Sequence, residues 1–311
     1  GLAIDYLNVD YNFSDNSVVN LYKQTFDFEE IQLTDSATKT SATLDGSISH
    51  QSFATWDLDL NVDTNNNRFL ILNTGFSEES LYYGTGYLNG TGRIFGSTKA
   101  LTINVIGATA RGTSLKIPLS DVATVGDYSF INFVTKEDLN QDTNRVLNEY
   151  EGLELIFDLD VTPEAEVEIV IDPSTKSSLK GTGGGTILME INTNGKFNMY
   201  GEFATATGEY NYKYGGIINR KFTVEPGGTI VWDGSPLAAT VNMKAIYSLE
   251  ANPAPLLDNT QYTSRIPVNV VVSLEGQLEK PNIEFGIEFP GAGSIVKSEL
   301  QYRLQDPNFA D

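Results

Sequence analysis

The chain has no cysteine, one histidine, and only 20 basic side chains against 41 acidic ones. Without cysteine it can form neither disulfides nor thiolate metal sites, and it has no thiol nucleophile. The lone His50 excludes multi-histidine metal sites and leaves one imidazole for any Ser-His-Asp triad. A net charge of −21 opposes binding of nucleic acid or anionic headgroups to a basic surface. We therefore expect no enzymatic activity, no cofactor and no metal.

Long apolar runs are also missing. No stretch approaches the roughly 18 apolar residues of a transmembrane helix, and neither an initiator Met nor a signal peptide is present. We therefore expect Gly1 to mark a piece of a longer precursor. Hydrophobic residues nevertheless make up 40% of the 311 residues, which is too apolar a composition for a disordered chain.

Apolar and polar residues alternate along most of the chain, and this period of two is typical of strands with one buried face. Clear runs start at Trp56, Leu153, Ile187, Ala239 and Ile266. Turn signals separate the runs, namely Asp45-Gly46, Asn194-Gly195, Pro226-Gly227-Gly228 and Asp233-Gly234. The pattern predicts an all-β chain of roughly 15 to 20 mostly antiparallel strands.

Two segments break the alternation. Residues 135–150 are polar and predict an inserted loop or short helix, whereas Ile295, Val296, Leu300 and Leu304 have helical spacing. We expect one continuous β structure over residues 1–311. Its predicted parts are a less regular half (1–134), the polar insertion (135–150), a regular half (151–293) and a terminal helix (294–311).

A sheet with one apolar face must cover that face. A sandwich, a closed soluble barrel, a membrane barrel and a curled open sheet with an apolar groove all satisfy this requirement. The membrane barrel is disfavoured because aromatic girdles are absent and the last strand-like run ends at Phe289-Pro290. The residues alone favour a sandwich core, which would use the same side chains as the groove.

A series of motifs between residues 83 and 257 carries a family resemblance. The motifs are Tyr83-Gly84-Thr85-Gly86-Tyr87, Gly112 to Leu119, the glycines 181, 183, 184 and 185, Gly208-Glu209-Tyr210, Arg220-Lys221-Phe222, Gly228 to Trp232, and Ala245-Ile246-Tyr247. In this order they resemble the TamB C-terminal domain family, the AsmA-like bridge lipid-transfer proteins of the translocation and assembly module in Gram-negative bacteria.

The resemblance implies a β-taco, which is an elongated U-shaped sheet with a hydrophobic interior. It also implies a periplasmic location within a longer protein anchored in the inner membrane. The expected partners are phospholipids and an Omp85-type outer-membrane barrel (TamA- or BamA-like). The family continues past the terminal helix into a segment that meets the barrel, so we expect the barrel-binding end to lie beyond Asp311.

The expected function is movement of phospholipid acyl chains along an apolar groove, since each buried CH₂ contributes about 0.8 kcal/mol. The predicted lining residues are Ile187, Met189, Ile191, Phe197, Met199, Phe203, Val241, Met243, Val268, Val270, Val272, Ile283, Phe285 and Ile287. The alternative is a chaperone or assembly module whose edge strands pair with outer-membrane protein or autotransporter strands by β-augmentation, together with an Omp85-type barrel.

Other groups of residues resemble binding or catalytic sites, but ordinary structural roles explain them better. Asp138, Asn140, Asp142, Asn144 and Glu149 have EF-hand spacing, but Thr143 occupies the glycine position, so a solvated acidic loop is favoured over calcium binding. The glycines at 181–185 lack the third glycine of a nucleotide loop and predict a bulge or close strand packing. His50 is predicted to be an exposed strand residue. The run Tyr210, Tyr212 and Tyr214 predicts β packing.

Overall fold

The computed structural model describes residues 1–77, 80, 82–118, 152–172, 175, 177–214, 218–257 and 264–305. The EF-hand-like segment and the whole predicted insertion lie outside these residues. Within them the chain forms one sheet of 19 strands with two short α-helices, which confirms the all-β prediction.

The strands of the first part span Leu2–Ile4 (β1), Val9–Phe13 (β2), Val19–Tyr22 (β3), Thr25–Asp35 (β4), Ser41–Gln51 (β5), Thr55–Asp63 (β6), Phe69–Thr74 (β7), Tyr83–Ser97 (β8), Ala100–Thr109 (β9) and Ser114–Pro118 (β10). A 3₁₀ turn, η1 (Asp5–Leu7), joins β1 to β2. The next strands are β11 (Gly152–Val161), β12 (Glu166–Asp172), β13 (Ser177–Asn192), β14 (Phe197–Tyr214), β15 (Ile218–Val224), β16 (Thr229–Gly234), β17 (Thr240–Ala251), β18 (Ile266–Gln277) and β19 (Asn282–Glu288). The remaining elements are η4 (Pro236–Ala238), α1 (Ala254–Leu257) and α2 (Ser294–Leu304).

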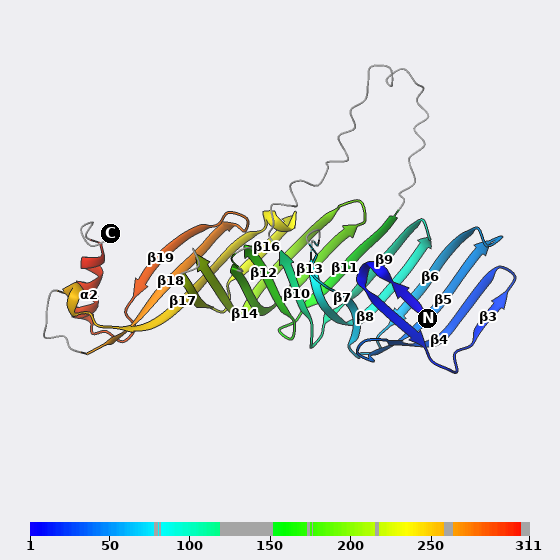
Figure 1. Cartoon of the computed structure of the whole chain (residues 1–311), viewed down its shortest axis with the longest axis horizontal. Helices are drawn as coiled ribbons and strands as arrows, with labels where there is room; N and C mark the ends of the chain where they lie inside the picture. Colours follow the sequence, from blue (N-terminus) through cyan, green and yellow to red (C-terminus); the bar gives the residue numbers. More distant parts are fainter. Residues whose placement is uncertain are drawn as a thin grey trace, which may run out of the picture.

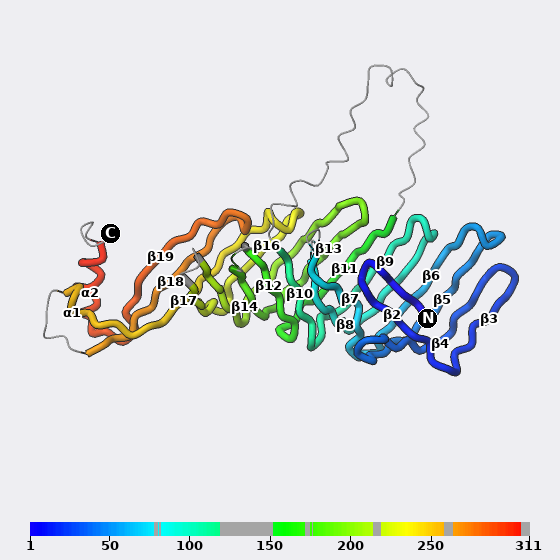
Figure 2. The backbone as a smooth tube through the Cα atoms, in the orientation of Figure 1, coloured from blue at the N-terminus to red at the C-terminus, as the bar shows by residue number. Residues whose placement is uncertain are grey.

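The strands stack side by side along a long axis, with the N-terminal strands at one end and α2 at the other (Figures 1 and 2). Neighbouring strands pair antiparallel, except for the parallel pairs β9–β11 and β10–β12. This arrangement confirms an elongated and mostly antiparallel sheet.

The sheet curls because its longest strands change partners along their length. In β13, Ser178–Thr182 pair with β12, whereas Gly185–Asn192 pair with β11. In β14, Met199–Ala204 pair with β16 and Gly208–Tyr214 pair with β15. β8 likewise pairs with β7 and β10 near its start and with β6 near its end. The sheet therefore has two walls. The first wall consists of β3, β5, β6, β9, β11, β16, β18 and β19. The second wall consists of β1, β2, β7, β10, β12 and β15.

Glycine permits the close approach of β13 and β14 where they pass from one wall to the other. A Cβ on Gly185 would overlap the carbonyl oxygen of Glu202, and one on Gly183 would overlap that of Ala204. The pairing register also shifts between Thr182 and Gly183. The predicted bulge and close packing at this cluster are confirmed.

The predicted turn at Asp45-Gly46 is wrong, since β5 runs straight through both residues. Gly46 has a φ of +125° and faces the backbone of Asp59, where a Cβ would not fit. The Asp45 carboxylate accepts a hydrogen bond from the backbone N–H of Glu30, where the β4–β5 register shifts. The dipeptide is therefore part of a register shift inside the sheet and does not form a hairpin loop.

The predicted terminal helix begins at Ser294, as expected. Leu300 is fully buried and packs with Leu257, Val268 and Phe289, while Ile295 points into solvent. No helix among the described residues has the length and apolar character needed to cross a bilayer.

Candidate functional site

The predicted lining residues lie on one face of the sheet. Directly opposed residues on neighbouring strands point to the same side. The opposed pairs that connect the set are Met189–Met199, Ile191–Phe197, Phe203–Ile230, Ile230–Val241, Met243–Leu274, Leu274–Ile283, Val272–Phe285 and Val270–Ile287. The same face continues through Leu155 and Ile103 into the N-terminal strands. We call it the inner face.

Burial along the inner face falls into two classes. Within the predicted set the residues of β13 to β17 are buried or half-buried, and so are Val268, Val270 and Val272 of β18. On β19, by contrast, Ile283, Phe285 and Ile287 are 43%, 67% and 41% exposed. The second wall explains the difference, because its last strand, β15, pairs with β17, and among the described strands none of that wall reaches β19.

In the part of the chain that the structure describes, three apolar cavities lie between the two walls. A first cavity of about 60 Å³ lies near the N-terminal end. A second and a third, each of about 80 Å³, follow along the sheet. The first and second share Leu7, Ile71, Leu88 and Phe157 in their linings, and the second and third share Leu115, Ile117, Leu159 and Met189. The cavities therefore form one line through the interior.

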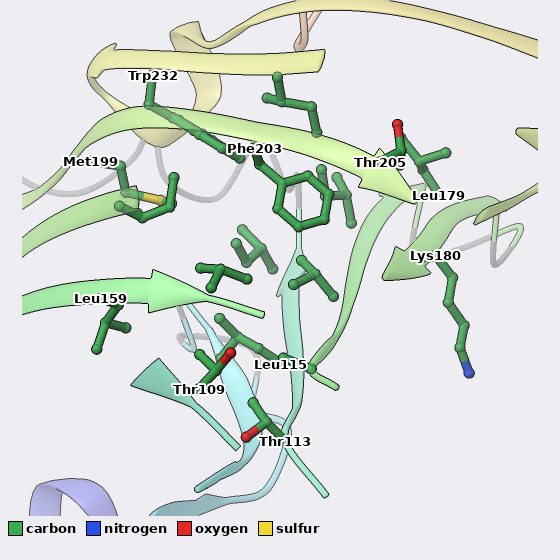
Figure 3. Close-up of a pocket in the computed structure, with 18 of the residues that line it drawn as sticks. Thr109, Thr113, Leu115, Leu159, Leu179, Lys180, Met199, Phe203, Thr205 and Trp232 are labelled. Carbon is green, nitrogen blue, oxygen red and sulfur yellow. The ribbon is translucent and has the colours of Figure 1, made fainter. Parts of the chain in front are cut away.

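The third cavity shows how both walls contribute. Leu159 of β11 comes from the first wall and Leu115 of β10 from the second, and Phe203, Met199 and Leu179 also line the cavity (Figure 3). Met189 and Phe197 pack against both main hydrophobic clusters of the protein, so the core is continuous.

The small size of these cavities shows that the two walls pack closely against each other. An engineered cavity that holds one benzene has about 150 Å³, which is larger than any of the three. In this state the interior resembles a sandwich core more than the open groove that we expected. An acyl chain requires the walls to move apart.

Among the described lining residues, few polar groups are free; the buried Tyr82 hydroxyl of the second cavity is one. The Thr113 hydroxyl already donates to the backbone carbonyl of Ala110 at 2.7 Å and accepts from the backbone N–H of Tyr87 at 3.0 Å. Lys180 lies at the margin of the third cavity, and its ammonium pairs with Glu166 at 2.8 Å. A ligand for this interior must therefore be apolar along the buried part of its length.

Charged groups pair across the outer face of the second wall. Lys116 meets Glu168 at 3.1 Å, and Lys221 meets Glu209 at 2.7 Å. Burial alone would raise the pKa of Glu168, but hydrogen bonds from Ser178 and Lys116 outweigh burial and hold that pKa below its usual value. The hydrogen bond to Glu166 raises the pKa of Lys180. The outer face thus carries paired charges that stay ionised.

His50 is only 6% exposed, so the prediction of an exposed histidine is wrong. The β5–β6 turn folds Phe53 over the imidazole at 3.9 Å, and the Phe53 N–H donates to Nδ1 at 3.2 Å. Trp56 packs against both rings, at 4.9 Å from the imidazole and 5.9 Å from Phe53. His50 is therefore part of an aromatic cluster at the edge of the inner face. Across the described ranges, His, Asp and Glu nowhere gather in a group of three that could hold a metal ion.

Sequence reasoning missed the side chains of the second wall that face the predicted row. Leu115 and Ile117 stand on the short strand β10, and Leu7 stands in η1. Strands of five residues give too few alternations to be recognised. Tyr210 packs against Tyr212 and Phe222, which confirms β packing for that pair; the Tyr214 side chain is outside the described set.

Comparison with known proteins gives one family. A model of the TamB C-terminal domain matches residues 30–306. No curated protein matches the chain.

Proposed function

Because the chain belongs to the TamB C-terminal domain family, we propose that it is a non-catalytic conduit that carries phospholipid acyl chains along its inner face. The family takes part in the translocation and assembly module, which works together with an outer-membrane protein, and its members are proteins of the cell envelope. We further propose that the chain acts in the periplasm, within a longer protein held in the inner membrane.

The observation that carries the proposal is the single apolar face that runs through the whole sheet. From the N-terminal strands to β19 it presents aliphatic and aromatic side chains, while charged pairs stand on the opposite face. The free energy gained by burying CH₂ groups does not depend on the lipid headgroup. We therefore expect little discrimination among phospholipids with equal acyl chains.

Photocrosslinking tests the proposal. A photoreactive residue at Phe203 or Val270 faces inward, whereas one at the neighbouring Glu202 faces outward and serves as the control. In the full-length protein in cells, the inward positions should capture phospholipid and Glu202 should not. Capture of polypeptide alone, or of nothing, at the inward positions contradicts the lipid function.

A second candidate is pairing with strands of outer-membrane proteins. The observation that favours it is the edge strand β19, which pairs only with β18 within the described residues and exposes Phe285. A free edge can accept an added strand through main-chain hydrogen bonds. A photoreactive residue on the β19 edge at Glu284 should then capture polypeptide, while the inward positions remain free of lipid.

A further inference from the structure

The N-terminal hairpin (β1, η1 and β2; Leu2–Phe13) covers the first cavity. Its side chains Leu2, Ile4, Leu7 and Tyr11 line that cavity from the second wall, opposite Ile103 of the first wall. In Figure 1 the dark-blue hairpin crosses in front of the strands of the first wall. Residues 2–13 precede the family match, which begins at residue 30.

The hairpin is joined to the rest of the second wall on one side only. On that side β2 pairs with β4 at Tyr11–Asp35, Asn12–Thr34 and Phe13–Leu33. On the other side, no ladder pairing joins it to β7 among the described strands, and side chains make the contacts.

Among the residues that the structure describes, two hydrogen bonds and one ring contact close the side that faces β7. The Tyr11 hydroxyl donates to the carbonyl of Leu70 at 2.8 Å, and the Asn8 amide donates to the carbonyl of Asn73. The Tyr11 ring stacks on Phe69 at 4.8 Å. By comparison, β10 forms ladders with β8 on one side and with β12 on the other. A segment held by few backbone hydrogen bonds opens at lower free energy than one paired on both edges.

We propose that the N-terminal hairpin is a displaceable lid that swings about β4 and admits an acyl chain sideways into the first cavity. The occupant is a hydrocarbon chain because the lining consists of aliphatic and aromatic side chains, glycines and two threonines, with no charged group. The acyl-chain part of this proposal rests on the proposed function, whereas the motion of the lid does not.

The absence of cysteine allows a clean test with single cysteines. Ile103→Cys lies behind the hairpin, and Ile187→Cys lies behind β10 and β12; both isoleucines are 4% exposed. With a small neutral maleimide under native conditions, Ile103→Cys should react at least about tenfold faster than Ile187→Cys. Adding Tyr11→Phe should accelerate the reaction of Ile103→Cys by about fivefold, the factor for one hydrogen bond, and leave Ile187→Cys unchanged. Equal rates for the two cysteines overturn the lid.

The same samples also test whether lipid binds in the first cavity. Vesicles of phosphatidylethanolamine and phosphatidylglycerol should slow the reaction of Ile103→Cys, because a bound chain fills the cavity. If Ile103→Cys reacts faster than Ile187→Cys but neither vesicles nor photocrosslinking reveals lipid, the lid stands and the lipid function fails. If lipid is captured while the two cysteines react equally, the lid fails and the lipid function stands.

Discussion

Ile191 and Ile287 belong to the same inner face but have opposite surroundings. Ile191 lies on β13, where the second wall covers it, and is 1% exposed; Ile287 lies on β19, beyond that wall, and is 41% exposed. Both stand in alternating segments with polar neighbours in the sequence. An apolar row in a curled sheet is therefore a closed core or an exposed surface according to whether another strand reaches across it.

The largest expected effect comes from truncating these two residues in parallel. Ile191→Ala should lower the free energy of unfolding by about 2–5 kcal/mol, because it leaves a cavity in a packed core. Ile287→Ala should cost less than about 1 kcal/mol, since the side chain is already 41% exposed and its removal leaves no enclosed cavity. Urea titration of both variants measures the difference. Equal losses would mean that β19 is covered.

The curvature that creates the second wall can be tested at Gly185. Gly185→Ala should cost about 1–3 kcal/mol, because the added methyl group overlaps the backbone of β14. Gly75→Ala is the control, since nothing lies within 4 Å of its added Cβ, and it should change stability by no more than about 1 kcal/mol. A tolerated Gly185→Ala would contradict a tight bend. Thermal unfolding of the two variants decides between these outcomes.

The two-walled part also contains a buried carboxylate, Asp35, at the β4–β5 turn. Burial alone would raise its pKa, but hydrogen bonds from Thr40 and Thr38 outweigh burial and hold the pKa below its usual value. A depressed pKa gives stability that is present above the unfolded pKa of about 4 and is lost as the pH falls through the folded pKa.

Asp35→Asn should therefore lose about 1–3 kcal/mol at pH 7, because some of these donors lose a charged acceptor. It should also show a weaker loss of stability below about pH 4 than the wild type does. Urea midpoints across pH 3 to 7 measure both effects. Parallel pH profiles for the wild type and the variant would show that Asp35 does not contribute.

The smallest expected effect on stability is at Phe285, which is 67% exposed. Phe285→Ser should change the free energy of unfolding by no more than about 0.5 kcal/mol. It should nevertheless reduce the fluorescence of a hydrophobic dye added to the protein. The reason is that it removes the most exposed aromatic ring from β19, the part of the inner face that the second wall does not cover. Unchanged dye binding would place the apolar surface elsewhere.

Alternation in the sequence predicted the strands and assigned all fourteen lining residues to one face. It could not predict which of them are covered, because the strands of the second wall pair with distant parts of β8, β13 and β14. The β1–β2 hairpin was missed for a related reason, since its strands have only three and five residues.

Two local predictions failed where tertiary contacts overrode local signals. Asp45-Gly46 has the composition of a hairpin turn but fits a close approach to Asp59 inside the sheet. His50 has polar neighbours in the sequence, yet Phe53 folds back over it from the next turn. Neither contact can be read from the residues adjacent in the sequence.

Native mass spectrometry with phospholipids tests the central claim most directly, namely that the inner face binds lipids by their acyl chains. The full chain is incubated with vesicles of phosphatidylethanolamine or phosphatidylcholine that carry identical acyl chains, and then with shorter-chain versions of each. We predict lipid adducts in equal amounts for the two headgroups, and weaker binding as CH₂ groups are removed, by up to about 0.8 kcal/mol per group. No adducts, or binding that follows the headgroup and ignores chain length, would contradict the account.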